Sequence, residues 1–194
     1  MAMHSSRRLI LRSNVVDADI WGFAERQGWT YLGHVPRDSE RGVFYEARWE
    51  VNDGNTVHFV IDEFADVLYM VVQHHDPKAT AKLARRIEDG LPVQSLEALA
   101  EEFDVNMYPA GWAKAVLALG VGAPRSMYEE FLNRIRESIG HREARVRSAA
   151  VWAMRYAAWP ELRQFLERMA QSETDPDVAG EIARAMEVFA AEYG

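Results

Sequence analysis

The pattern of hydrophobic and polar residues along the chain changes character near residue 76. Before that point apolar and polar residues alternate, which is typical of half-buried β-strands. The predicted strands are Arg8 to Arg12, Trp29 to Val35, Val43 to Val51, Thr56 to Phe64 and Val67 to His74. We expect these strands to form an antiparallel meander.

Two local signals refine this first part of the chain. A helix is predicted over Ala18 to Gln27, because apolar residues recur there at helical spacing. Asp17 is its expected N-cap, and Gly28 is expected to end it. The segment Asn52-Asp53-Gly54-Asn55 is typical of a hairpin turn, since Asp-Gly readily adopts the positive φ angles of a tight turn.

From Pro77 onward the apolar period becomes helical, and glycines and prolines divide the chain into seven predicted helices. The helices are Lys78 to Asp89, Ser95 to Phe103, Gly111 to Leu119, Ser126 to Ile139, Ala144 to Ala158, Pro160 to Gln171 and Asp177 to Glu192. The expected fold is therefore α+β. An antiparallel sheet domain is expected over residues 1–76, and a helical domain over residues 77–194.

The helical part contains an internal repeat of about 32 to 35 residues. Residues 131–138 match residues 165–172 at four of eight positions, at an offset of 34. Residues 115–119 align with residues 150–154 at an offset of 35. The second helix of each repeat is rich in alanine, and small side chains allow neighbouring helices to approach closely. We therefore expect helix pairs stacked into a short solenoid.

Two motifs carry a resemblance to a known family. Asp175-Pro176-Asp177-Val178 leads into an alanine-containing helix, and residues 145–154 form a similar Ala-rich segment, Arg-Val-Arg-Ser-Ala-Ala-Val-Trp-Ala-Met. Together they resemble the short HEAT repeats of the phycobilisome-lyase type, over about residues 111–192. The resemblance implies an α-solenoid whose commonest role is that of a binding scaffold.

The predicted helix over Ala144 to Ala158 carries the most prominent candidate surface. If its alanines and Met154 face the core, side chains at i, i+3, i+4 and i+7 spacing form an outward stripe. The repeat offsets add one residue from each neighbouring helix. The predicted partner-binding residues are Leu117, Trp152, Arg155, Tyr156, Trp159 and Arg184. Aromatic and arginine side chains often anchor interfaces. The alternative is that Trp152 or Trp159 packs against the β-rich half.

Arginines around residues 134–155 form a second candidate surface. They are Arg134, Arg136, Arg142, Arg145, Arg147 and Arg155. Such a patch could bind phosphate, and together with Trp152 and Trp159 it resembles the alkylpurine DNA glycosylases built from HEAT-like repeats. That family is helical throughout, whereas the first 75 residues here predict strands. Glutamates nearby also favour solvated helix faces with i,i+4 pairs.

No catalytic or metal-binding motif stands out in the sequence. Asp62, Glu63 and Asp66 cluster where two strands connect, and carboxylates are ordinary turn residues there. His74 and His75 are adjacent in a strand, so their side chains point to opposite faces of the sheet. We therefore assign no catalytic residues, no metal ligands and no cofactor.

Composition narrows the function classes. The 194 residues include no cysteine, which excludes disulfides, thiolate metal sites and cysteine nucleophiles. The net charge of −8 opposes non-specific binding to nucleic acid or anionic membranes, and its sign suits a basic partner. The longest apolar run, Val67 to Val72, is too short to span a bilayer. These features predict a cytoplasmic protein without membrane contact.

The sequence as a whole favours a non-catalytic protein-interaction module, such as an adaptor, a regulator or an immunity-type inhibitor. Two alternatives stay open. One is a nucleic-acid-binding or DNA-repair protein, and the other is a small-molecule sensor with a pocket between sheet and helices. The aromatic residues expected at such a pocket are Tyr31, Tyr45, Trp49 and Tyr69.

Overall fold

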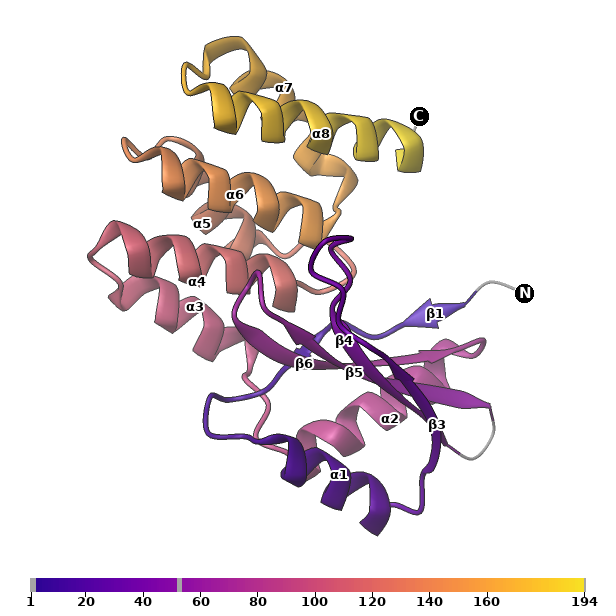
Figure 1. Ribbon diagram of the computed structural model, residues 1–194. Coiled ribbons are helices and arrows are strands. Elements are labelled where there is room, and N and C mark those ends of the chain that lie inside the picture. Colours follow the sequence, from indigo (N-terminus) through magenta and orange to yellow (C-terminus); the bar gives the residue numbers. More distant parts are fainter. Residues whose placement is uncertain (1–2, 52–53, 194) are drawn as a thin grey trace. The chain divides into compact units, whose positions relative to one another are not determined.

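The computed structural model describes residues 3–51 and 54–193 (Figure 1). The chain divides into two compact units, Met1–Gln94 and Ser95–Gly194, which we call the sheet unit and the helical unit. This division differs from the one expected after residue 76, because the helix over residues 77–90 packs on the sheet. The fold is α+β, with an N-terminal antiparallel sheet followed by helices, as predicted.

The sheet unit is built around an antiparallel sheet with the strand order β1-β6-β5-β4-β3, in which β2 also pairs with β6. Its elements are β1 (His4–Ser5), β2 (Leu9–Ile10), α1 (Asp17–Arg26), β3 (Thr30–Val35), β4 (Tyr45–Val51), β5 (Asn55–Asp62), β6 (Val67–His74) and α2 (Pro77–Gly90). Strands β3 to β6 follow one another as the predicted meander. Strand β1 was not predicted, because neither His4 nor Ser5 is an apolar residue that could indicate a buried face.

The core of the sheet unit lies between one face of the sheet and the helices α1 and α2, which both cover that face (Figure 1). Ala47, Phe59 and Met70 are directly opposite one another on β4, β5 and β6, and all three are fully buried. The helices complete this core with apolar side chains, namely Ile20, Phe23, Ala24, Leu83, Ala84 and Ile87. The alternation along the strands therefore predicts the buried face correctly.

Two expected details of the sheet unit need comment. Asp17 does not cap α1: Val16 is the N-cap, and its backbone N–H donates a hydrogen bond of 3.0 Å to the carboxylate of Asp19. A carboxylate at the third helical position can fill this role, so the aspartate chosen from the sequence was the wrong one. In the expected turn over residues 52–55, Asn52 and Asp53 lie outside the described residues, and Gly54 has a φ of +75°.

The helical unit consists of consecutive helix pairs, α3 with α4, α5 with α6 and α7 with α8 (Figure 1). Its elements are α3 (Leu96–Val105), α4 (Pro109–Gly122), α5 (Glu129–Ile139), α6 (Ala144–Ala157), the short 3₁₀ helix η1 (Pro160–Leu162), α7 (Arg163–Ser172) and α8 (Pro176–Tyr193). The second helices α4, α6 and α8 pack against one another in succession. The bounds agree with the helices predicted from the sequence to within a few residues.

Helices α4 and α6 lie in close contact at Gly120. A Cβ atom on Gly120 would overlap the backbone of Ala153, so only glycine fits there. Ala150 and Ala153 on α6 are completely buried, and residues 115–123 are buried without interruption. The prediction that small residues bring these helices together is therefore confirmed for α4 and α6.

Candidate functional site

The outward stripe predicted on α6 exists only in part. Val146, Ala150, Ala153 and Met154 are buried, as expected, while Trp152, Arg155 and Tyr156 are half-exposed. The guanidinium of Arg155 lies 4.1 Å from the centroid of the Trp152 indole, within the range of a cation–π contact. Three of the predicted partner-binding residues therefore share one face of α6.

The other predicted partner-binding residues do not extend this surface. Trp159 has no exposed surface, and its Nε1–H donates a hydrogen bond of 2.8 Å to the backbone carbonyl of Pro124. Ala158 precedes it in a left-handed conformation (φ +50°) and ends α6, so Trp159 leaves the i+7 position of the stripe. Leu117 is buried within α4, and Arg184 is exposed on α8. The six residues do not form one exposed face.

A groove of about 590 Å³ lies in the helical unit, where the ends of α5 and α7 meet the connections that follow them. Its lining residues come from α5, the α5–α6 connection, the start of α6, α7 and the α7–α8 connection. They are Arg136, Ile139, Gly140, His141, Arg142, Arg147, Phe165, Arg168, Met169, Ser172, Glu173 and Thr174. Four arginines and one glutamate line it, so its charge is opposite in sign to that of the whole chain.

One of these arginines is part of the wall rather than open to a ligand. Arg147 donates hydrogen bonds of 2.8 and 2.7 Å to the two carboxylate oxygens of Glu173. Its third nitrogen donates to the carbonyls of His141 and Arg142. Glu173 is almost completely buried, and the hydrogen bonds from Arg147 lower the pKa of its carboxyl group from an ordinary 4.5 to about 2. This pair stays ionised and fixes the groove's two connections to each other.

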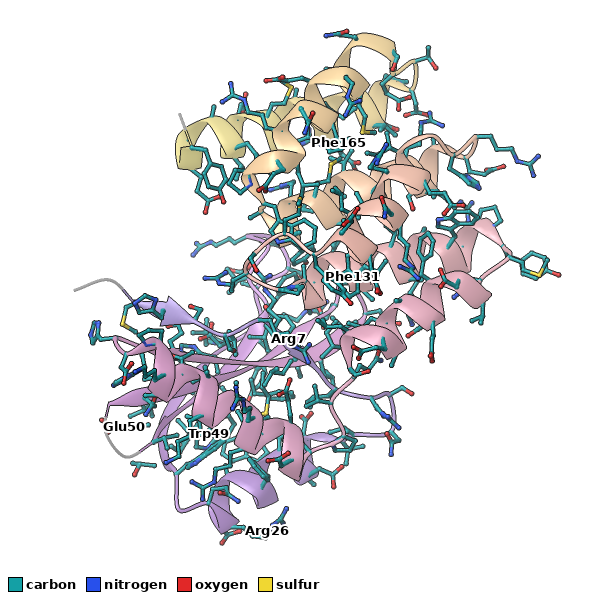
Figure 2. All side chains as sticks on the ribbon, turned by 180° about the vertical axis from the view of Figure 1, so that it is seen from behind. Arg7, Arg26, Trp49, Glu50, Phe131 and Phe165 are labelled. Carbon is teal, nitrogen blue, oxygen red and sulfur yellow. The ribbon has the colours of Figure 1, made fainter. Side chains whose placement is uncertain are left out.

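The opposite side of the groove centres on Phe165, a half-exposed residue of α7 that Figure 2 labels. The guanidinium of Arg168 lies 4.5 Å from the centroid of its ring, and that of Arg136 lies 5.8 Å from it. Arg142 is in the α5–α6 connection, and its side chain is 87% exposed. The ring of Phe165 is thus contacted by the guanidinium groups of Arg136 and Arg168, and Arg142 adds a third positive charge to the groove. Together these side chains form a flat, positively charged surface.

The sequence indicated part of this groove and missed part of it. Arg136, Arg142 and Arg147 belong to the predicted arginine patch, but Arg168 and Phe165 were not singled out. The repeat aligns Phe165 with Phe131, which is fully buried in the core of the unit (Figure 2). In α7 the buried positions are instead Leu166 and Met169, together with Leu162 of the preceding η1 turn, so Phe165 faces the groove. The only sign in the sequence that Phe165 could be important was its alignment with Phe131 in the repeat.

The remaining arginines of the predicted patch lie in different environments. Arg134 makes two hydrogen bonds, 2.9 and 2.6 Å long, with the carboxylate of Asp104 on α3 and so links two helix pairs. Arg145 is exposed at the start of α6, and Arg155 contacts Trp152. The six arginines therefore do not form one continuous cationic surface.

Two polar side chains of the sheet unit, His58 and Asp62, have structural partners. His58 Nδ1 is 2.5 Å from a carboxylate oxygen of Glu46, and its Nε2 is 3.1 Å from the Thr56 hydroxyl. Buried Asp62 accepts a hydrogen bond of 2.9 Å from the backbone N–H of Ala65, as a turn residue does. Within residues 3–51 and 54–193, no group of three or more His, Asp or Glu side chains is arranged to hold a metal ion.

The aromatic residues considered for a sensor pocket lie in several environments. Trp49 is buried in the core, and Trp21 packs edge-on against it with ring centroids 5.0 Å apart. The hydroxyl of Tyr31 is 2.9 Å from His34 Nδ1. Tyr69 is buried, and this desolvation raises the pKa of its phenol. None of the four proposed aromatic residues lines the groove described above.

Comparison with known proteins adds no relative to this picture. No protein-family model, curated protein or solved structure matches the chain. Across the part of the chain that the structure describes, no helix combines the length and the apolarity needed to cross a membrane. Membership of the HEAT-repeat family stays a prediction, and the role of the groove has to be argued from its own side chains.

Proposed function

We propose that this chain is a non-catalytic protein-interaction module whose helical unit binds a segment of a partner protein in the groove between α5 and α7. The observation that carries the proposal is Phe165 with the guanidinium groups of Arg136 and Arg168 against its ring. Arginine and aromatic residues are enriched among the side chains that contribute most to protein–protein affinity. A concave site that combines them suits recognition of a partner.

The chemistry of the groove favours binding over catalysis. Arginine stays protonated at physiological pH and has no lone pair with which to accept a proton. Glu173, the carboxylate among the described lining residues, is already paired with Arg147 and has a lowered pKa, which makes it a weak general base. His141 accepts a hydrogen bond of 3.0 Å from the backbone N–H of Glu143 through Nδ1, which occupies that nitrogen.

The stacked helix pairs support the same role. A scaffold in which each pair contacts its neighbours presents the connections between helices at one edge, and the groove is formed by such connections. The half-exposed face of Trp152, Arg155 and Tyr156 on α6 is a second place where a partner could contact the unit. We propose that the protein acts in the cytoplasm. A chain without cysteine has no disulfide bonds that the reducing conditions there could break.

The proposal is tested by affinity purification of the full chain from its native cells, followed by mass spectrometry and by rebinding of each purified candidate. We compare wild type with an Arg136→Ala/Arg168→Ala variant. The control is Arg163→Ala, which removes one positive charge from α7, at an exposed ion pair with Glu167. The proposal expects a protein that wild type and Arg163→Ala bind and that the double variant loses.

Two results would contradict it. One is recovery of the same proteins by wild type and the double variant, and the other is recovery of no protein by wild type. Circular dichroism and thermal unfolding of each variant establish that the chain is folded, so that lost binding is not confused with lost structure.

A further inference from the structure

The cations of the groove differ in whether they already have an anionic partner. Arg147 is neutralised by Glu173. By contrast, no carboxylate of the described residues lies within 4.0 Å of the guanidinium of Arg136 or Arg168, and Arg142 reaches only Glu143, at 3.9 Å. The Nε of Arg168 donates to the backbone carbonyl of Gln164, which leaves its charge uncompensated. Among the described residues, Arg136 and Arg168 thus have no carboxylate at ion-pair distance, and Arg142 has one only at the limit of that distance.

These free charges stand out because the chain as a whole is acidic, with 30 acidic residues against 22 basic ones. Some arginines of the helical unit are paired with carboxylates: Arg134 with Asp104, Arg147 with Glu173 and Arg163 with Glu167. Arg136 and Arg168 differ from these, because they lie against one aromatic ring in a concave site. An acidic protein that keeps Arg136 and Arg168 without a carboxylate partner among the described residues, against the ring of Phe165, presents a site for an external anion.

From this arrangement we infer that the groove binds an acidic segment of a partner protein, with Asp or Glu carboxylates on Arg136, Arg142 and Arg168 and an apolar side chain against Phe165. This inference rests on the proposed function and names the chemistry of the partner. Guanidinium groups bind carboxylates through paired hydrogen bonds, and the half-exposed ring of Phe165 offers contact area to a neighbouring apolar group. The net charge of the chain alone suggested a basic partner, whereas the groove favours an acidic segment.

The size and surroundings of the groove favour a short peptide over a nucleic acid. Its volume of about 590 Å³ lies within the usual range of ligand sites and accommodates a few residues. A nucleic acid carries a charge at every nucleotide and extends well beyond such a site, over a chain whose net charge is −8. A short acidic peptide places its few charges inside the groove only, where the local potential is positive.

The test is a fluorescence-anisotropy titration of the purified full chain with a labelled peptide that contains four consecutive Glu residues. The same peptide with Gln in place of Glu is the uncharged comparison. We expect the Glu peptide to bind at least tenfold more tightly than the Gln peptide at low ionic strength. We also expect affinity to fall steeply with added NaCl, because exposed charges are screened.

Variants separate charge from the special geometry of arginine. Arg136→Ala/Arg168→Ala is expected to weaken binding of the Glu peptide at least tenfold, and Arg136→Lys/Arg168→Lys to weaken it less. Lysine keeps the charge but loses the flat, two-pronged guanidinium. Arg163→Ala is expected to bind within about twofold of wild type, because exposed pairs such as Arg163 with Glu167 contribute little.

The inference is wrong if the Glu and Gln peptides bind equally, or if the alanine variant binds the Glu peptide as wild type does. It is also wrong if a labelled DNA duplex, or inorganic phosphate used as a competitor, binds this site more tightly than the peptide. Such a result would not contradict the proposed function if affinity purification recovers a protein partner. It would show only that the groove does not recognise acidic side chains of that partner. Conversely, peptide binding without any native protein partner would contradict the proposed function and not the groove's preference for carboxylates.

Discussion

Arg147 and Glu173 form a two-pronged ion pair that joins the start of α6 to the connection between α7 and α8. The two residues are 26 positions apart in the chain. Glu173 also accepts hydrogen bonds from the backbone N–H groups of Thr174 and Asp175. The carboxylate of Asp175 in turn accepts hydrogen bonds from the backbone N–H groups of Asp177 and Val178 at the start of α8. One ion pair thus fixes the geometry from which the last helix begins.

Replacing Arg147 by alanine is expected to lower the free energy of unfolding of the helical unit by about 3 kcal/mol. The side chain of Glu173 is 4% exposed, and without Arg147 its carboxylate would lose the cation that compensates for this burial. Chemical denaturation measures the effect, with Arg163→Ala as the control at an exposed pair. A loss equal to that of the control would show that the buried pair contributes no more than a surface pair does.

The stability of the helical unit should depend on pH through Glu173. Its pKa is about 2 when folded and near 4.5 when exposed, so the unfolded chain binds more protons between these values. The contribution of Glu173 is therefore complete above about pH 4.5 and is lost as the pH falls toward 2. Denaturation of wild type and Glu173→Gln at several pH values measures this. The difference between the two should shrink on acidification, and a difference that stays constant would contradict the assignment.

Gly120 and Gly180 offer a matched pair of helical glycines. Gly120→Ala is expected to destabilise the protein by about 3 kcal/mol, because the added Cβ would overlap the backbone of Ala153. Gly180→Ala should instead stabilise α8 by up to about 1 kcal/mol, since its Cβ would meet only the flexible end of Arg184, at 3.5 Å. Thermal unfolding of the two variants tests the opposite signs. Equal effects would show that α4 and α6 can separate without cost.

Trp159 is expected to act on stability and not on partner choice. Trp159→Ala should cost about 4 kcal/mol, and Trp159→Phe should cost about 1 kcal/mol through loss of the hydrogen bond to the Pro124 carbonyl. The exposed Arg184→Ala should change the free energy of unfolding by less than about 0.5 kcal/mol. If Trp159→Ala left unfolding unchanged and abolished partner binding, the original assignment of Trp159 to a surface would be right after all.

The fold was largely predictable because most strands and helices show the period of their own type clearly. The alternation along β4 places Ala47 and Trp49 on the same face of the strand, and both are buried. The unit to which α2 belongs could not be predicted from the apolar pattern of that helix. An amphipathic helix shows that it packs on something, but Leu83 and Ile87 do not reveal that this is the sheet.

The candidate site was predictable in composition and not in position. The predicted arginine patch includes Arg136 and Arg142, which line the groove. The predicted partner-binding surface was instead placed mainly on α6, because the aromatic residues of that helix recur at helical spacing. The η1 turn before α7 changes which residues of that helix are buried, so Phe165 is half-exposed where Phe131 is buried. A small rotation of a helix about its axis changes which residues are buried, and an alignment of two short repeats does not reveal it. It nevertheless decides which residue lines the groove.

The pairing of β2 with β6 affects how the two units acquire their structure. Leu9 and Met70 are neighbours in the sheet, and Leu11 forms a bridge with Val93, so the sheet unit joins the two ends of its own sequence. Each helix pair, by contrast, closes through contacts between adjacent segments. Distant pairings slow folding because a long loop must be ordered first. We therefore expect the sheet unit to set the slow step of refolding, while the helices that form the groove assemble from local contacts.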